Sequence, residues 1–300
     1  MKIILIYFTG TYNTRYLSQL MKNRLENKGH DVDLVEIKGD TPQKDVSSYD
    51  LIGFSYPIYG FNAPKIFDKY TKKLNIQKGQ KCFIYKNSGE TFAMNNPSSR
   101  YLKKIIKRRK GILINEKHYV MPYNIHFKYE DEFVKEIFSY NDKLMDIQLY
   151  EIENNIINII KSKFIYDFAA WFVLLQRFGA FVNSYLYRVD MNKCIDCGLC
   201  IKTCPMNNIY KNKKGKIKLH NKCLMCMRCS FYCPKDAFNI GFLQSWGWKV
   251  NGGYEYGRIL NDPNIKGKYI TNESKGFYSC FIKKWKEIDD KYNEYFPNNK

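Results

Sequence analysis

Short apolar runs alternate with longer polar stretches over the first 120 residues of the chain. The apolar runs predict strands. Some of them, such as Ile3-Ile4-Leu5-Ile6, are apolar at consecutive positions, as strands of a parallel sheet covered on both faces are. Alternation of strands and helices is typical of a doubly wound α/β fold. We predict strands over Lys2–Phe8, Asp31–Ile37, Asp50–Ser55, Lys81–Asn87 and Gly111–Val120, and helices over Asn13–Lys28, Pro64–Leu74 and Ser98–Lys110.

The pattern changes after residue 130. Phe133–Lys163 carries apolar positions at helical spacing and predicts a further helix. The stretch from 164 to 190 is rich in aromatic residues and poor in charge, and we interpret it as a helix packed between two domains rather than one on a membrane surface. We expect a first domain over 1–165, a helical connector over 166–189, a compact Cys-rich domain over 190–241 and a tail over 242–300 that packs on the domains.

Composition narrows the class of protein. At 45% hydrophobic the chain is too apolar to be disordered. Eight of the ten cysteines fall between Cys194 and Cys233, which indicates metal ligation in a reducing compartment rather than a disulfide framework. The longest uncharged run near the middle, Phe168–Gln176, is far shorter than a spanning helix needs, and the N-terminus lacks a signal-peptide pattern. We therefore expect a cytoplasmic protein without a transmembrane segment.

The chain is strongly basic, with 49 Lys and Arg against 29 Asp and Glu, a formal net charge of +20. Two basic runs, Lys103–Lys110 and Lys211–Lys218, have no nucleic-acid motif beside them, so we expect solvated faces and no nucleic-acid partner. A surface this positive should attract acidic redox proteins and speed their encounter with the chain.

The cysteines form two similar runs. Every cysteine of the second run lies 29 positions after its counterpart, so the segment is an internal duplication. Each run ends in Cys-Pro. The first run has Cys194, Cys197, Cys200 and Cys204, and the second has Cys223, Cys226, Cys229 and Cys233.

This spacing favours iron–sulfur clusters. Three thiolates on one tight loop can reach three irons of a cubane, and in the two-cluster bacterial pattern the fourth cysteine serves the other cluster. A pair of zinc sites is the alternative, but zinc does not explain the third cysteine, the Cys-Pro or the repeat. The segment resembles the bacterial 2[4Fe-4S] ferredoxin domain, except that Met227 stands where the first half has Gly198. We predict cluster I on Cys194, Cys197, Cys200 and Cys233, and cluster II on Cys204, Cys223, Cys226 and Cys229.

The end of the first predicted strand carries a second candidate site. Thr9-Gly10-Thr11-Tyr12-Asn13-Thr14 precedes a predicted helix, and hydroxyls with free backbone N–H groups at a helix start suit one phosphate monoester. Gly10 stands alone, so the dinucleotide pattern is absent, and so is the Gly-Lys-Ser/Thr of a P-loop. A phosphate loop with hydroxyls and no lysine suits flavin mononucleotide (FMN), although a Thr-rich turn can also only cap a helix.

This loop resembles that of the flavodoxin family, which implies the strand order 2-1-3-4-5 with FMN at the switch point. The resemblance implies that Thr9, Thr11, Asn13 and Thr14 bind the phosphate, while Tyr12 departs from the glycine of many members. It also implies two loops that flank the flavin, with Tyr59 stacked on the ring and Gly89 near flavin N5. These are Tyr56-Pro57-Ile58-Tyr59-Gly60 and Asn87-Ser88-Gly89-Glu90-Thr91.

Domain order extends the resemblance to fused flavodoxin–ferredoxin proteins of anaerobic bacteria, the EFR1-family ferredoxins. It implies an electron-transfer protein in which FMN takes two electrons and releases them one at a time to cubanes. The rival is an FMN-dependent reductase of a small acceptor such as a quinone or nitro compound, with the clusters as relay. A third interpretation is a regulatory module whose flavodoxin fold is empty, which Tyr12 alone supports. The sequence leaves open whether the protein is an enzyme, and it shows no catalytic acid–base pair.

Overall fold

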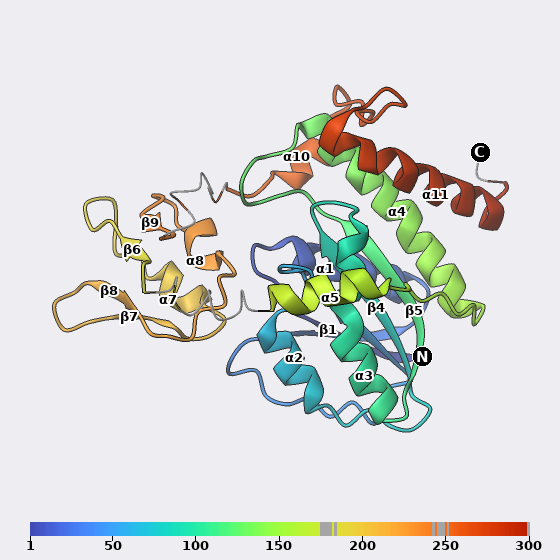
Figure 1. Cartoon of the computed structure of the whole chain (residues 1–300), viewed down its shortest axis with the longest axis horizontal. Coiled ribbons are helices and arrows are strands. Elements are labelled where there is room, and N and C mark those ends of the chain that lie inside the picture. Colours follow the sequence, from blue (N-terminus) through green and yellow to red (C-terminus); the bar gives the residue numbers. More distant parts are fainter. Residues whose placement is uncertain (175–181, 183–184, 242–243, 245–249, 251, 299–300) are drawn as a thin grey trace.

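A computed structural model describes residues 1–174, 182, 185–241, 244, 250 and 252–298. Figure 1 shows a larger α/β body and a smaller body of short helices and hairpins beside it. The strands are β1 (Lys2–Tyr7), β2 (Asp31–Glu36), β3 (Leu51–Ser55), β4 (Lys81–Ser88), β5 (Ile112–Val120), β6 (Arg188–Val189), β7 (Ile209–Lys211), β8 (Ile217–Leu219) and β9 (Phe238–Asn239). The helices are α1 (Asn13–Asn27), α2 (Lys65–Lys72), η1 (Ala93–Ser99), α3 (Arg100–Arg108), α4 (Asp131–Glu153), α5 (Phe164–Val173), α7 (Leu199–Thr203), α8 (Arg228–Phe231), α10 (Tyr256–Asn261), η2 (Gly276–Tyr278) and α11 (Ser279–Tyr295).

The larger body is built on a five-stranded parallel sheet with the order β2-β1-β3-β4-β5. Successive residues of each strand enter opposite layers of the core, as the pleat requires. Ile3 and Leu5 pack with α1 and α4 on one face, and Ile4 and Ile6 pack with α2 and α3 on the other. Burial on both faces explains the continuous apolar runs, and the expected doubly wound sheet is confirmed.

Helix boundaries differ from the prediction at two places. The helix expected over Phe133–Lys163 ends at Glu153, because Asn155 takes a φ of 54° and the chain turns. The chain then runs beside β5, where Asn158 accepts from the backbone N–H of Glu116 at 2.8 Å. The open edge of the sheet thus competes with the helix for these backbone groups. The helix expected over Ser98–Lys110 begins as η1 and continues as α3.

The smaller body repeats its own backbone at the interval found in the sequence. Left-handed φ values occur at Asp196 and Met225, at Gly198 and Met227, and at Asn207 and Asp236, each pair 29 residues apart. Gly198 and Met227 immediately precede α7 and α8, which pack together. The departure from glycine at Met227 therefore leaves the local fold unchanged.

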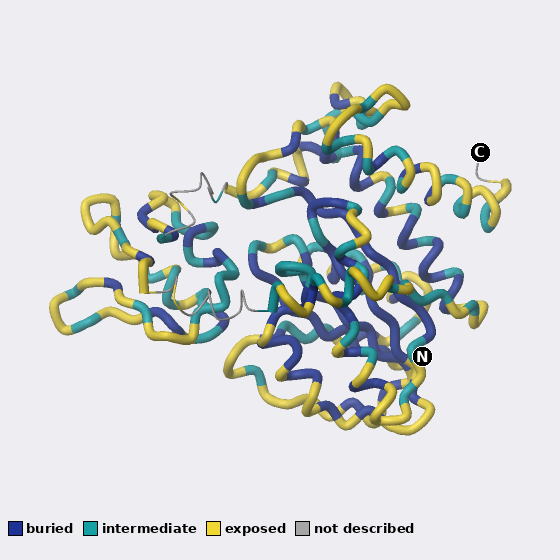
Figure 2. The backbone as a smooth tube through the Cα atoms, in the orientation of Figure 1, coloured by how far each residue is buried: buried dark blue, intermediate teal, exposed yellow. Residues whose placement is uncertain are grey.

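The described tail returns to the larger body. Helices α10 and α11 lie against α4, where Phe281 and Trp285 are buried and Trp285 stacks on Tyr140 at 4.3 Å. Figure 2 shows this buried seam between the two long helices. Val250 contacts the apolar cluster around Met227 in the smaller body. The smaller body is thus connected to the α/β body through both of its chain ends.

Helix α5, expected between two domains, lies on η1 of the larger body. The side chain of Asn62 donates to the carbonyl oxygen of Ala170 at 2.9 Å, and Ala170 is the buried residue of this helix. Phe164, Phe168 and Trp171 are exposed. Residues 175–181 and 183–184 of the expected connector lie outside the described residues. In the described part of the chain no helix combines the length and apolar character that crossing a membrane requires.

Candidate functional site

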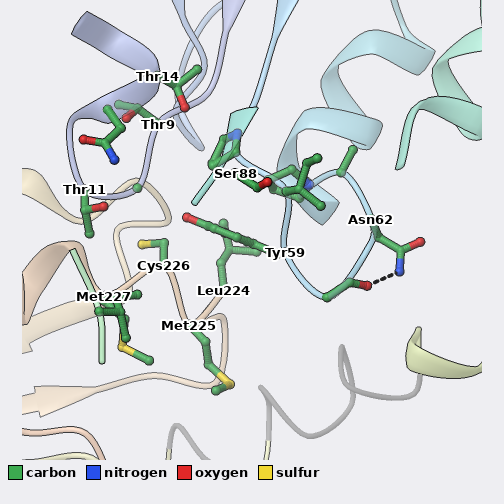
Figure 3. A pocket seen from close by; sticks show the side chains of 18 of the residues that line it. Thr9, Thr11, Thr14, Tyr59, Asn62, Ser88, Leu224, Met225, Cys226 and Met227 are labelled. Atoms are coloured by element: carbon green, nitrogen blue, oxygen red, sulfur yellow. Dashed lines mark hydrogen bonds between the residues drawn. The ribbon is translucent and has the colours of Figure 1, made fainter. Parts of the chain in front are cut away.

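A cavity of about 610 Å³ opens at the carboxyl ends of β1, β3 and β4. This is the point where the strand order reverses, which is where doubly wound folds bind ligands. Both bodies line this cavity. Loops of the α/β body form most of its wall, and the loop 221–227 of the smaller body closes the remaining side (Figure 3). The lining includes Thr9, Gly10, Thr11, Asn13, Thr14, Pro57, Tyr59, Gly60, Asn87, Ser88 and Gly89, all expected at a flavin site.

Two residues expected at this site lie elsewhere. Tyr12 does not line the cavity, and its ring faces Tyr16 at a centroid distance of 6.3 Å. Its φ of 80° is a strained value for an aromatic residue, at the position where the flavodoxin resemblance expects glycine. Tyr56 does not line the cavity either; its ring is fully buried and packs on Phe67.

The loop after β1 has the features of an anion cradle. The hydroxyl of Thr9 is buried and has no hydrogen-bond partner among the described residues. Thr14 instead donates to the side-chain oxygen of Asn87 at 2.8 Å, which joins the first loop to the end of β4. A buried hydroxyl without a partner is costly. A phosphate oxygen in the cavity would satisfy that of Thr9.

Asn13 holds the loop to the rest of the body. Its amide nitrogen donates to the carbonyl of Pro122 at 2.6 Å, and its oxygen accepts from the hydroxyl of Tyr256 at 2.7 Å. Asn124 donates to the backbone oxygen of Thr11 at 2.8 Å. Asn13 is therefore fixed by protein partners, including one from the tail. Its side chain is therefore already bonded, and what it can offer a phosphate is its backbone N–H at the start of α1.

Tyr59 lies across the middle of the cavity, between the first loop and the smaller body (Figure 3). A Cβ atom on Gly10 would stand 2.1 Å from the hydroxyl of Tyr59 and 2.9 Å from the carbonyl oxygen of Cys226. Only glycine therefore fits where these two groups meet the loop. Burial, together with the neighbouring Cys226, raises the pKa of Tyr59 well above its ordinary value, so its hydroxyl stays protonated.

The loop after β4 is braced from behind. Ser88 shares a hydrogen bond of 2.7 Å with Nε2 of His118, and Tyr129 donates to the carbonyl of Gly89 at 2.6 Å. The ring of Tyr123 lies so close to Gly89 that a Cβ there would be 2.5 Å from it. Burial lowers the pKa of His118 well below its ordinary value, so its ring is neutral near pH 7.

The eight cysteines of the repeat gather into two groups. Cys194, Cys197, Cys200 and Cys233 border one small cavity, while Cys204, Cys223, Cys226 and Cys229 border another. The fourth cysteine of each run thus lies with the three of the other run, as crossed ligation requires.

The surroundings of the two fourth cysteines are equivalent. The backbone N–H of Asn208 donates to the sulfur of Cys204 at 3.3 Å, and that of Ala237 donates to the sulfur of Cys233 at 3.3 Å.

Burial raises the pKa of Cys223 to about 12 and that of Cys200 to about 11. Thiolates at these positions need a positive counter-charge, which the irons of a cluster supply.

Arg228 joins the second cysteine group to the first loop. Its guanidinium donates to the carbonyl oxygens of Thr9 and Gly10 and pairs with the carboxylate of Glu36 at 3.0 Å. It also donates to the carbonyl of Thr203 at 3.3 Å, and the residue is only 5% exposed. One buried side chain therefore fixes the distance between the two bodies.

A second contact supports this interface. The backbone N–H of Gly39 donates to the carbonyl oxygen of Pro205 at 2.5 Å, and a Cβ on Gly39 would lie 3.0 Å from that oxygen. Sequence reasoning missed both Gly39 and Arg228. For Arg228 a signal exists, because the duplicated segment has Leu199 at the equivalent position.

Comparison with known proteins identifies the smaller body. The family model for a 4Fe-4S dicluster domain matches residues 193–238. A ferredoxin of Pyrobaculum islandicum is 29% identical over 80 residues, which cover 26% of this chain and 75% of that ferredoxin. An uncharacterized protein of Methanocaldococcus jannaschii is 31% identical over 67 residues, which cover 22% of this chain and only 25% of that protein's length. Residues 193–238 are a 4Fe-4S dicluster domain.

Among solved structures, oxidised flavodoxin 2 of Bacillus cereus matches with 19% identity and a TM-score of 0.34, covering 40% of this chain and 86% of that one. The strand order itself makes the larger body flavodoxin-like. An iron–sulfur dicluster domain whose second cysteine group borders the cavity of a flavodoxin-like domain is suited to moving electrons.

Proposed function

We propose that the chain passes electrons between FMN in the large cavity and two [4Fe-4S] clusters, and from there to redox partner proteins in anaerobic metabolism. One observation carries the proposal: the same cavity is lined by the three flavodoxin-type loops and by Cys223 and Cys226 of the dicluster domain. This arrangement supports the resemblance to the EFR1-family ferredoxins, in which we place the chain.

The residues present fit FMN. Thr9 offers a buried hydroxyl without a partner among the described residues, and Gly10 and Gly89 both line the cavity between the first loop and the loop after β4. Bound there, FMN would supply two-electron chemistry with release of electrons one at a time. Thr9 and Thr11, with the backbone N–H groups of Asn13 and Thr14 at the start of α1, would hold its phosphate, while Tyr59 would cover the ring from the side of the dicluster domain.

We assign cluster II to Cys204, Cys223, Cys226 and Cys229, and cluster I to Cys194, Cys197, Cys200 and Cys233. Cluster II then lies next to the flavin cavity and cluster I farther away, so the order of centres is FMN, cluster II, cluster I. Arg228 keeps the first two of these centres together. The N–H groups of Asn208 and Ala237 donate to ligand sulfurs and thereby favour the reduced clusters.

A second candidate function is the FMN-dependent reduction of a small acceptor. Its support is the size of the cavity, about 610 Å³, which continues beyond the three loops to Lys65, Lys69 and Val173. An anaerobic steady-state screen of quinones and nitro compounds separates the two candidates. Saturable and selective turnover of one small acceptor would favour the reductase, whereas slow and unselective reduction of all of them would favour the carrier.

Anaerobic purification followed by iron, sulfide and flavin counts on one sample tests the cofactor assignment. We expect about eight iron, about eight sulfide and about one FMN per chain. Zinc in place of iron, or a preparation without flavin, would contradict the proposal.

A further inference from the structure

The two cysteine groups differ in their access to solvent. Cys197 is exposed, whereas its counterpart Cys226 lies against Gly10 beneath the cavity. Electrons that leave for another protein must pass through the part of the dicluster domain that such a protein can touch. That part surrounds the first cysteine group, and Figure 1 shows the neighbouring hairpin of β7 and β8 on the side away from the α/β body.

Positive charge is concentrated in the dicluster domain. Ten Lys and Arg face three Asp between residues 190 and 239, and no Glu occurs there. Five of the lysines belong to the hairpin of β7 and β8, and Lys211 alone pairs with an acid, Asp196, within the described residues. The unpaired lysines of the hairpin are Lys213, Lys214, Lys216 and Lys218, all exposed.

The hairpin is attached to the first cysteine group. Ile217 of β8 borders the same cavity as these cysteines, and the ion pair of Lys211 reaches the loop between Cys194 and Cys197. Apolar side chains lie exposed beside the lysines: Ile195 is 57% exposed, and Leu199 and Tyr210 are also exposed. An apolar centre within a charged rim is the usual anatomy of a protein–protein interface.

We propose that the loop of Cys194–Cys200 and the β7–β8 hairpin form the docking face for a small acidic electron-transfer protein. This rests on the proposed function, since it names the surface at which FMN and the two clusters exchange electrons with another protein. The lysines would steer an acidic partner and the apolar centre would bring its redox group close to cluster I. The other basic run, on α3, lies on the α/β body and takes no part.

The test measures binding of a purified acidic two-cluster ferredoxin to the cofactor-loaded protein by calorimetry, at low and at high salt. The hairpin variant reverses three charges: Lys213→Glu, Lys214→Glu and Lys216→Glu. The matched control reverses three on α3: Lys104→Glu, Lys107→Glu and Arg108→Glu. All six side chains are exposed, so neither variant disturbs a core. Iron and flavin counts on both variants verify that they are folded and loaded.

We expect the hairpin variant to bind about 10-fold or more weakly at low salt, and the α3 variant to bind within about 2-fold of the wild type. High salt should weaken the wild type and leave the hairpin variant little changed. Equal losses in both variants would overturn the proposal, because bulk charge alone would explain them. Absence of binding to the ferredoxin at low salt would overturn it as well.

A short RNA duplex serves as a second probe. If it bound the wild type as tightly as the ferredoxin and lost affinity in the same variant, the face would recognise polyanions and the proposal would fail. Failure here is separable from failure of the proposed function. The latter would appear as missing flavin or iron in the wild type, whatever the hairpin variant does.

Discussion

The two halves of the dicluster domain hold their cysteines in the same way and meet different neighbours. Left-handed residues recur at the 29-residue interval, and each fourth cysteine accepts one backbone N–H at 3.3 Å. Yet the first half exposes Cys197 to solvent, while the second places Cys226 against Gly10. Duplication therefore fixes the ligand geometry, and the substitutions between the halves determine which half faces the flavodoxin-like domain.

Leu199 and Arg228 carry most of this difference. They occupy equivalent positions at the start of α7 and α8. Leu199 is exposed, whereas Arg228 is buried and bonded to the loop after β1. If this contrast is the cause of the asymmetry, changes at the second half should disturb the interface and matched changes at the first half should not.

The largest effect should come from Arg228→Leu, which copies the first half into the second. It removes the ionic partner of Glu36, which keeps the hydroxyl of Tyr7 at 3.3 Å, and it leaves the carbonyl oxygens of Thr9, Gly10 and Thr203 without this donor, at a cost of about 3 kcal/mol. We expect weaker retention of FMN and a lower melting temperature in calorimetry. The control is Leu199→Arg, which lies on the exposed half and should change neither quantity. Equal behaviour of the two variants would contradict the role of Arg228.

A smaller effect is expected from Gly10→Ala. The added Cβ would stand 2.1 Å from the Tyr59 hydroxyl and 2.9 Å from the Cys226 carbonyl, so the two bodies must separate or Tyr59 must move. Such overpacking costs about 2 kcal/mol. Thermal unfolding and the flavin dissociation constant measure it. Gly257→Ala is the control: it lies in α10, where the added Cβ meets nothing beyond its own stretch of helix within 4 Å, so it should leave the flavin dissociation constant unchanged and should not lower the melting temperature. Normal FMN binding by Gly10→Ala would refute the close approach of Tyr59 and Cys226 to Gly10.

The smallest effect is expected from Gly198→Ala, which tests whether the two halves of the dicluster domain are equivalent. Gly198 has a φ of 68° with open space around it, so Gly198→Ala adds only backbone strain, about 1 kcal/mol. The dicluster domain should lose that stability in denaturant unfolding while its iron content stays the same. A loss of iron would show that Gly198 does more than allow the turn.

Much of this architecture is predictable from the sequence because it is local. The five strands begin and end within two residues of the predicted positions, since buried parallel strands need continuous apolar runs. The grouping of the eight cysteines follows from their spacing. The loop of Thr9–Thr14 lies in the cavity because a strand that ends before a helix has little freedom to place it elsewhere.

The remainder depends on tertiary partners that spacing does not encode. The isoleucines after Glu153 keep helical spacing, yet the open edge of β5 pairs with Asn158 instead. Tyr56 is adjacent to the flavin loop but turns into the core with Phe67. The burial of Arg228 depends on where the second domain docks, and a single sequence gives no access to that placement except through the contrast with Leu199.

The proposed order of the redox centres places cluster II between the flavin cavity and cluster I. Its most direct test compares Cys204→Ala with Cys233→Ala, a matched pair 29 residues apart that leaves the lining of the flavin cavity untouched. In dithionite-reduced protein, paramagnetic broadening of the ³¹P signal of FMN reports the nearer cluster. We predict that Cys204→Ala narrows this signal and Cys233→Ala leaves it broad, with each variant losing about half of its iron. Narrowing in Cys233→Ala alone would contradict the claim.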